Sequence, residues 1–175
     1  MGVQTNTTPT DQLERDQALD IKKSFIVQAP AGSGKTGLLT LRFLRLLSVC
    51  EQPEQVLAIT FTRKAASEMR DRIINTLWWA AEYIGNSTSI KNNYDALRLR
   101  IAKAVLSRDQ ELKWQLLNNP SRLRVQTIDS FCFYLANRLP VLSQIGGNPN
   151  VSTDVELCFR DAIANTLLQL ESDSA

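Results

Sequence analysis

The stretch that decides the fold is SFIVQAPAGSGKT, residues 24–36, in which a short apolar run leads into a glycine-rich turn ending in Gly-Lys-Thr. Residues 24–28 are rich in apolar side chains and too few for a helix, so they predict a buried strand of a parallel sheet. Gly32 and Gly34 allow a tight turn whose amide N–H groups point inward and form an anion-binding nest. The leucine-rich residues 38–47 predict a helix whose positive N-terminal end faces the anion.

The turn follows the pattern G-x-x-x-x-G-K-[ST], except that Ala29 takes the first glycine position, a sterically mild replacement. In this pattern the lysine, here Lys35, reaches the β- and γ-phosphates, and the hydroxyl, here Thr36, ligates Mg²⁺. The alternative is an ordinary glycine turn with an exposed lysine, which the strand before the turn and the helix after it disfavour. The sequence therefore predicts a nucleoside-triphosphate site formed by Ala29, Pro30, Ala31, Gly32, Ser33, Gly34, Lys35 and Thr36.

The composition is that of an ordinary globular domain. The chain has 175 residues, of which 43% are hydrophobic and 22% charged, and its formal net charge of +2 says little about partners. The chain contains no histidine, the commonest general base and metal ligand. Cys50, Cys132 and Cys158 match no zinc spacing and are expected to be buried thiols in a reducing compartment. Because residues 1–10 are polar and no apolar stretch approaches about 18 residues, we expect a cytoplasmic protein without membrane contact.

Alternating strand and helix patterns predict an α/β protein with a parallel sheet and right-handed crossovers. Further strands are expected at residues 56–60 and 124–128. The expected helices are residues 11–20 with Leu13, Ala18 and Leu19 inward, a long helix from Lys64 with Ala65, Met69, Ile73, Leu77 and Ala81 inward, two patterns within 94–117, and residues 129–138 and 154–170. The basic side chains at Arg98, Arg100, Lys103 and Arg108 are expected to form a solvated helix face.

These elements suggest an order of segments along the chain. Residues 1–10 are expected to be a disordered tail, residues 11–77 the first part of the core, and residues 78–121 a helical insertion, because that stretch is too long for a simple crossover. Residues 122–140 would add the third strand and its helix, and residues 141–175 a loop and the start of a further helical segment.

A second motif, TFTRKAASEMR, follows the expected strand at residues 56–60. Phe61 stands between Thr60 and Thr62 and is followed by Arg63 and Lys64, at the carboxyl edge of the sheet where ligands bind. An exposed aromatic ring beside hydroxyls and cations suits single-stranded nucleic acid, because the ring can stack on a base. Alternatively, Phe61 fills the core and the cations are solvated, and the residue types alone do not decide between the two.

A third motif, TIDSFC at residues 127–132, again places hydroxyl groups at a strand end before a helix. Thr127 and Ser130 could contact a ligand there. Capping of the following helix explains Asp129 or Ser130 equally well.

Taken together, APAGSGKT, ITFTRKAASEMRDRI and TIDSFC resemble, in this order, the N-terminal part of UvrD/Rep-type superfamily 1 DNA helicases. The residues within these motifs are most similar to those of the RecB/AddA-like branch, the exonuclease V beta-like helicase-nuclease subunits. The resemblance covers residues 11–170. It implies an incomplete parallel sheet of the P-loop NTPase (RecA-like) kind and an ATP-dependent DNA helicase of recombinational DNA repair. It also implies ATP and Mg²⁺ as ligands, single-stranded DNA and DNA ends as substrates, and a nuclease or helicase partner subunit in the full-length protein.

The resemblance assigns roles to individual residues. Lys35 and Thr36 would be the catalytic phosphate lysine and the magnesium-ligating hydroxyl. Asp129 replaces a histidine frequent in the third motif, and Arg15 stands where the family often has an adenine-reading glutamine, with Gln12 and Gln17 nearby. The residues implied to contact DNA are Thr60, Phe61, Thr62, Lys64, Thr127 and Ser130, together with Arg63, which stands where many relatives carry asparagine.

One expected element is missing from the sequence. Enzymes of this kind need a strand ending in Asp-Glu to complete the magnesium site, and no apolar run in these 175 residues ends that way. We therefore expect a segment truncated before the catalytic acid, which alone binds nucleotide weakly and hydrolyses it negligibly. The alternatives are a non-enzymatic nucleotide- or DNA-binding module, and a P-loop kinase, which would leave the second motif unexplained.

Overall fold

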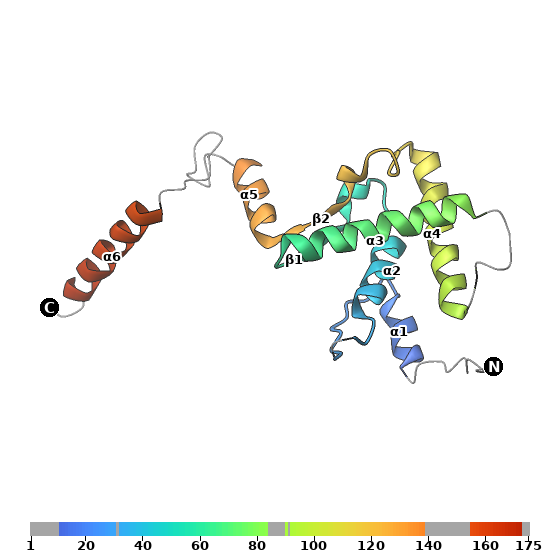
Figure 1. Ribbon diagram of the computed structural model, residues 1–175, viewed down its shortest axis with the longest axis horizontal. Helices are drawn as coiled ribbons and strands as arrows, with labels where there is room; N and C mark the ends of the chain where they lie inside the picture. The colour runs from blue at the N-terminus through green and yellow to red at the C-terminus, as the bar shows by residue number, and fades with distance from the viewer. Residues whose placement is uncertain (1–10, 31, 84–89, 91, 139–154, 173–175) are drawn as a thin grey trace, which may run out of the picture. The chain divides into compact units, whose positions relative to one another are not determined.

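The computed structural model describes residues 11–30, 32–83, 90, 92–138 and 155–172 (Figure 1). The chain divides into two compact units, residues 1–131 and 132–175. The expected tail at residues 1–10 and the expected loop at residues 140–152 lie outside the described residues. The helices are α1 (Gln12–Ala18), α2 (Lys35–Leu47), α3 (Arg63–Glu82), α4 (Asn93–Leu112), α5 (Ile128–Arg138) and α6 (Val155–Ser172), and the strands are β1 (Leu57–Thr60) and β2 (Arg124–Thr127).

The sheet of the first unit consists of β1 and β2, which run parallel as expected. Their register pairs Leu57 with Arg124 at one end and Thr60 with Thr127 at the other. Helix α3 packs along both strands, and it lies beside them in Figure 1. The expectation of parallel strands at residues 56–60 and 124–128 is therefore confirmed, apart from one residue at an end of each strand.

The expectation of a third, buried strand at residues 24–28 is wrong for this structure. The segment has no ladder partner among the described residues, and its side chains are exposed, Ile26 by 99%. A strand requires a neighbour to accept and donate its backbone hydrogen bonds, and here β1 and β2 pair with each other. Arg42 of α2 instead holds the chain just before the segment, because its guanidinium donates to the carbonyls of Ala18, Asp20 and Lys23.

The core lies between α2, α3, α4 and the sheet. On α3, Ile73 and Leu77 are fully buried as their spacing predicts, whereas Ala81 is exposed. On α1, Ala18 is buried, but Leu13 is 76% exposed, contrary to the expectation that it faces inward. Burying a leucine or isoleucine side chain contributes about 1.5–3 kcal/mol, so these contacts supply much of the stability of the unit. The largest fully buried side chains are Leu44, Leu47, Ile73, Leu77, Ile101, Val105, Leu116, Leu123 and Val125.

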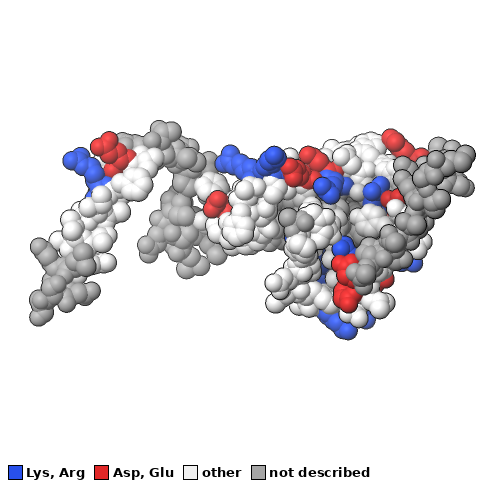
Figure 2. Space-filling view, turned by 60° about the horizontal axis from the view of Figure 1, so that its bottom comes forward, with Lys and Arg blue, Asp and Glu red and all other residues white. Residues whose placement is uncertain are grey.

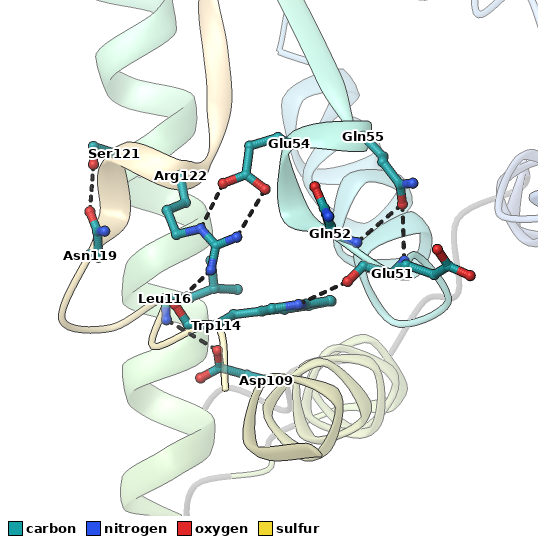
Figure 3. A network of polar contacts seen from close by, with 10 residues as sticks. All are labelled: Glu51, Gln52, Glu54, Gln55, Asp109, Trp114, Leu116, Asn119, Ser121 and Arg122. Atoms are coloured by element: carbon teal, nitrogen blue, oxygen red, sulfur yellow. Dashed lines mark hydrogen bonds and ion pairs between the residues drawn. The ribbon is translucent and has the colours of Figure 1, made fainter. Parts of the chain in front are cut away.

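Only one of the two helices expected within residues 94–117 forms. Helix α4 ends at Leu112, and the backbone then turns through Lys113 and Gln115, whose φ angles of 56° and 60° are left-handed. The carboxylate of Asp109 accepts a hydrogen bond from the Leu116 N–H at 3.1 Å, which stabilises the turn (Figure 3). The turn buries Trp114 and Leu116, so the apolar spacing that suggests a second helix comes from a compact turn instead.

A polar network joins the two turns that precede the strands (Figure 3). Arg122 donates from Nε and Nη2 to the two carboxylate oxygens of Glu54, at 2.6 and 3.1 Å, and from Nη1 to the carbonyl of Trp114 at 3.1 Å. The Trp114 indole donates to the carbonyl of Glu51 at 3.0 Å. Hydrogen bonding from Arg122 holds the pKa of the Glu54 carboxyl below its usual range. The network ties the start of β1 to the start of β2 and thereby holds their register.

The cysteines differ from expectation. Cys132 and Cys158 are exposed, and Cys50 is only partly buried, although this burial still raises the pKa of its thiol. Cysteine usually prefers the interior, but α5 and α6, which carry the two exposed thiols, bury few side chains of their own. None of the helices in the described ranges combines the length and apolarity that a membrane crossing requires.

We predict that Glu54→Gln lowers the free energy of unfolding by about 1–2 kcal/mol at pH 7, because it removes a bidentate charge-assisted pair. The folded-state pKa of Glu54 is lowered, so its contribution is complete above the ordinary glutamate pKa of about 4.3 and disappears as pH falls through the lowered value. The stabilities of the wild type and the variant should therefore converge in acid. Chemical denaturation at several pH values measures this.

Glu111→Gln is the matched control, because Glu111 also pairs with an arginine but its side chain is 64% exposed. A stability difference between wild type and Glu54→Gln that stays constant down to about pH 3, below the ordinary glutamate pKa, would contradict the assignment.

Candidate functional site

The glycine turn, residues 29–36, leads directly into α2. Gly34 is the N-cap of this helix with a φ of 83°, and Gly32 has a φ of 79°. Both values lie in the left-handed region that glycine adopts without strain, which explains why glycine stands at these two positions. No side chain among the described residues caps α2, so its first amide groups remain suited to an anion.

Lys35 folds back over this turn. Its ammonium group donates to the carbonyl of Ala29 and, at 2.6 Å, to the carbonyl of Pro30. The Ser33 N–H donates to the same Pro30 carbonyl at 3.4 Å. Lys35 therefore holds the turn closed from inside, while Thr36 is exposed next to it; Ala31 lies outside the described residues.

A cavity of about 470 Å³ lies between α1 and the glycine turn. Arg15 enters it from α1, where its guanidinium donates to the carbonyl of Ser33 at 2.8 Å and pairs with Asp11. Gln17 also lines the cavity, whereas Gln12 donates to Asp16 at 2.8 Å. The lining residues are Asp11, Glu14, Arg15, Gln17, Ala18, Phe25, Ile26, Val27, Gln28, Ala29, Ser33, Lys35 and Leu38.

The donor set of the turn fits a polyphosphate. It combines the Lys35 ammonium, the uncapped start of α2 and a backbone that curves at two left-handed glycines. The exposed Thr36 hydroxyl fits one oxygen position around Mg²⁺. Within the described residues no three acidic, histidine or cysteine side chains gather into a metal site. Among the described residues of the turn, Thr36 is therefore the candidate magnesium ligand.

The carboxyl ends of the strands bring the second and third motifs together. Thr60 and Thr127 are register partners on β1 and β2. The Thr127 and Ser130 hydroxyls lie 2.9 Å apart, and the Ser130 N–H donates to Thr127 Oγ1 at 3.2 Å. Thr127 therefore takes the capping role at the start of α5 that the sequence suggests for Asp129 or Ser130. It can do so because α5 begins at Ile128, one residue earlier than expected.

Phe61 projects from this edge with 86% of its surface exposed. The alternative that Phe61 fills the core is therefore wrong for this structure. Thr62 is the N-cap of α3, where its hydroxyl accepts from the Ala65 N–H at 3.1 Å. Arg63 and Lys64 occupy the exposed first turn of that helix, with Lys64 4.0 Å from the Glu68 carboxylate.

Charge is distributed without one dominant patch on the face shown in Figure 2, where basic and acidic side chains are interspersed. This fits the small formal net charge of +2. On this face no broad positive field is present that would attract an anion.

Two contacts of the site have only weak signals in the sequence. Arg70, inside the second motif, donates to the carbonyl of Val125 at 2.6 Å and so anchors α3 to β2. The Tyr94 hydroxyl of α4 lies 3.0 Å from the point where a Cβ on Gly37 would stand. A glycine within a helical pattern often marks such a close approach, so Gly37 is the residue of the sequence that indicates this contact.

Comparison with known proteins matches residues 10–173 to the UvrD/REP helicase N-terminal domain. The chain is 30% identical over 158 residues to an ATP-dependent helicase/nuclease subunit of Clostridium perfringens, and this alignment covers 87% of this chain and 11% of the relative. The protein of the same name from Lactobacillus gasseri is 32% identical over 142 residues, or 81% of this chain and 10% of the relative. The ATP-dependent DNA helicase UvrD1 of Mycobacterium bovis is 38% identical over 89 residues, or 46% and 12%. The chain thus spans about a tenth of the length of these curated relatives.

We predict that Thr62→Ala lowers the free energy of unfolding by about 1 kcal/mol, because it leaves an amide group at the start of α3 without its hydroxyl partner. Thermal unfolding followed by circular dichroism measures the change. Ser67→Ala serves as the control, since Ser67 is exposed on the same helix and makes only a 3.5 Å contact to Asp71. Equal stabilities of the two variants would show that the Thr62 cap contributes nothing.

Proposed function

The chain belongs to the UvrD/REP helicase family, and from this premise we propose that it is the N-terminal ATP-binding and single-strand-DNA-binding segment of an ATP-dependent DNA helicase. The finer assignment is to a helicase-nuclease subunit of recombinational DNA repair. The observation that carries the proposal is the pairing of a lysine-closed glycine turn at the start of α2 with an exposed aromatic ring at the carboxyl edge of β1. Each would serve one of the two ligands.

ATP would bind at the glycine turn with its phosphates at the start of α2. Lys35 would exchange its bonds to the Ala29 and Pro30 carbonyls for bonds to phosphate oxygens, which are stronger because both partners are charged. A magnesium ion held partly by Thr36 would neutralise phosphate charge when bound. The glycines at 32 and 34 let the backbone approach the phosphates closely.

Single-stranded DNA would lie along the carboxyl edge of the sheet. Phe61 offers an exposed ring for a base. Thr60, Thr127 and Ser130 place hydroxyl groups at the ends of the same two strands, although Thr127 is only 6% exposed and bonds to Ser130. Arg63 and Lys64 would contact phosphates from the first turn of α3, and Thr62 would act mainly by capping that helix. The proposed path of the DNA thus combines groups from the carboxyl ends of both β1 and β2.

The remaining proposals concern the longer protein of which this segment would be part. The names of the relatives include a helicase/nuclease subunit, which motivates a nuclease or helicase partner and DNA ends as substrate. Hydrolysis needs an acid to complete the magnesium site and arginines to stabilise the transition state. No apolar run in these 175 residues ends in the acidic pair Asp-Glu, so we propose that the chain alone binds ATP but hydrolyses it negligibly. ATP hydrolysis by this chain that is stimulated by single-stranded DNA would contradict that statement.

We predict that Lys35→Ala weakens binding of a fluorescent ATP analogue about tenfold or more, because a charge-assisted bond to phosphate is lost. Lys22→Ala, which removes an exposed lysine outside the turn, is the control and should bind as the wild type does. Fluorescence titration with Mg²⁺ present measures both. If Lys35→Ala kept full affinity, the ATP site would be wrong and a non-enzymatic module would become the better interpretation.

We predict that Phe61→Ala weakens binding of a labelled oligothymidylate by about 1–3 kcal/mol, the usual contribution of one stacked base. Its unfolding temperature should stay unchanged, because the ring is 86% exposed. Trp78→Ala removes another exposed aromatic side chain from α3 and should bind normally. Anisotropy titrations at several salt concentrations measure these affinities.

The same titrations test Lys64. Lys64→Ala should reduce the salt dependence of binding, since one fewer counterion is released. An unchanged salt slope would remove Lys64 from the proposed phosphate contacts, and a loss well below about 0.5 kcal/mol for Phe61→Ala would remove the stacked base.

A further inference from the structure

One side chain of α1 reaches the glycine turn and bonds to its backbone. Arg15 donates from Nη2 to the carbonyl of Ser33 at 2.8 Å, across 18 positions of sequence. Its Nη1 atom lies 3.5 Å from the point where a Cβ on Gly34 would stand. The guanidinium therefore lies in van der Waals contact with the Ser33–Gly34 peptide, and the φ of 83° at position 34 is what favours glycine there.

Asp11 holds this guanidinium in place. The Asp11 carboxylate accepts from Arg15 Nε at 2.9 Å and from Nη2 at 2.8 Å, which is a bidentate pair between α1 and the residue before it. The side chain of Arg15 is 25% exposed and that of Asp11 is 52% exposed, so the pair stands at the solvent-facing rim of the cavity. Hydrogen bonding to Asp11 raises the pKa of Arg15 and lowers that of Asp11.

The geometry of the peptide unit turns this contact into a constraint on the ligand site. A trans peptide is planar, and its C=O and N–H point in opposite directions. The carbonyl that Arg15 holds belongs to Ser33, and the N–H on the other side of the same plane belongs to Gly34, the N-cap of α2. A cation bound to the carbonyl also polarises the peptide and makes its N–H a stronger donor.

Resting on the proposed function, we propose that Arg15 is a positioning residue for the phosphates: it holds the Ser33 carbonyl so that the Gly34 N–H stays aimed into the anion-binding turn, and Asp11 holds Arg15. Arg15 acts through the backbone and makes no contact with the nucleoside. Glycine at position 34 leaves the backbone on one side of this peptide free to adopt other φ angles, so a side chain that holds the Ser33 carbonyl restricts the orientation of the peptide.

The test compares a nucleotide with a ligand that has only phosphates. Fluorescent ATP is titrated into the 175-residue chain and displaced by inorganic tripolyphosphate, for the wild type, Arg15→Met, Arg15→Lys and Asp11→Asn. We expect Arg15→Met to weaken both ligands by the same factor of about 5–20. Arg15→Lys and Asp11→Asn should lose less, about 2–5-fold, because one keeps a cationic donor and the other keeps a weaker acceptor.

Two controls separate positioning from general destabilisation. Arg45→Met removes an exposed arginine of α2 outside the turn and should bind as the wild type does. The amide resonance of Gly34 should shift in Arg15→Met without ligand, whereas those of Phe61 and Lys64 should not. If Arg15→Met destabilises α1, the smaller losses of affinity for ATP and tripolyphosphate in Arg15→Lys and Asp11→Asn still test the proposal.

The outcomes are distinct. Loss of ATP affinity with tripolyphosphate affinity intact would overturn the inference, because Arg15 would then contact the nucleoside. Wild-type affinity in Arg15→Met beside a loss in Lys35→Ala would overturn it too, while leaving the proposed ATP site in place. A wild-type chain that binds neither ligand would overturn both.

Discussion

The parallel pairing of β1 with β2 is the constraint on which the rest of the first unit depends. At the start of the strands, the Glu54–Arg122 pair and the Trp114 indole tie the two preceding turns together. At the other end, the same register sets Thr60 beside Thr127. Because side chains alternate along a strand, a slip of one residue would turn one threonine to the opposite face and separate the motifs. A polar network at the start of the strands therefore sets which side chains lie side by side at their carboxyl ends.

The elements with a strong local pattern are those that can be predicted well from the sequence. The apolar runs at 56–60 and 124–128 predict both strands, and the four-residue spacing of Ile73 and Leu77 predicts the buried face of α3. The threonines at the strand ends can be grouped without knowledge of the register, because parallel strands carry their ligands at one edge. These inferences need only periodicity and the topology of a parallel sheet.

The failures share a different physical cause. Residues 24–28 have the composition of a buried strand, but a strand forms only where a neighbouring strand pairs with it. In the described structure the segment has no such partner, and Ile26 is exposed. The spacing of Leu112, Leu116 and Leu117 is typical of a helix, yet the Asp109 carboxylate stabilises a turn there by accepting from the Leu116 N–H. Arg15, Arg42 and Arg70 each donate to a backbone carbonyl distant in sequence, and no periodic pattern reveals such a bond.

Two cations serve the glycine turn in different ways, and the difference bears on how the site would work. Lys35 is bonded to carbonyls of the turn that lie within six residues of it, so phosphate oxygens can replace those partners without moving a helix. Arg15 comes from another helix, and its bidentate pair with Asp11 holds the guanidinium at the Ser33 carbonyl. Charge-assisted bonds to phosphate exceed bonds to a neutral carbonyl, which favours exchange at Lys35. On the proposed function, Lys35 would therefore move with the ligand, while Arg15 would keep the peptide donors aimed at it.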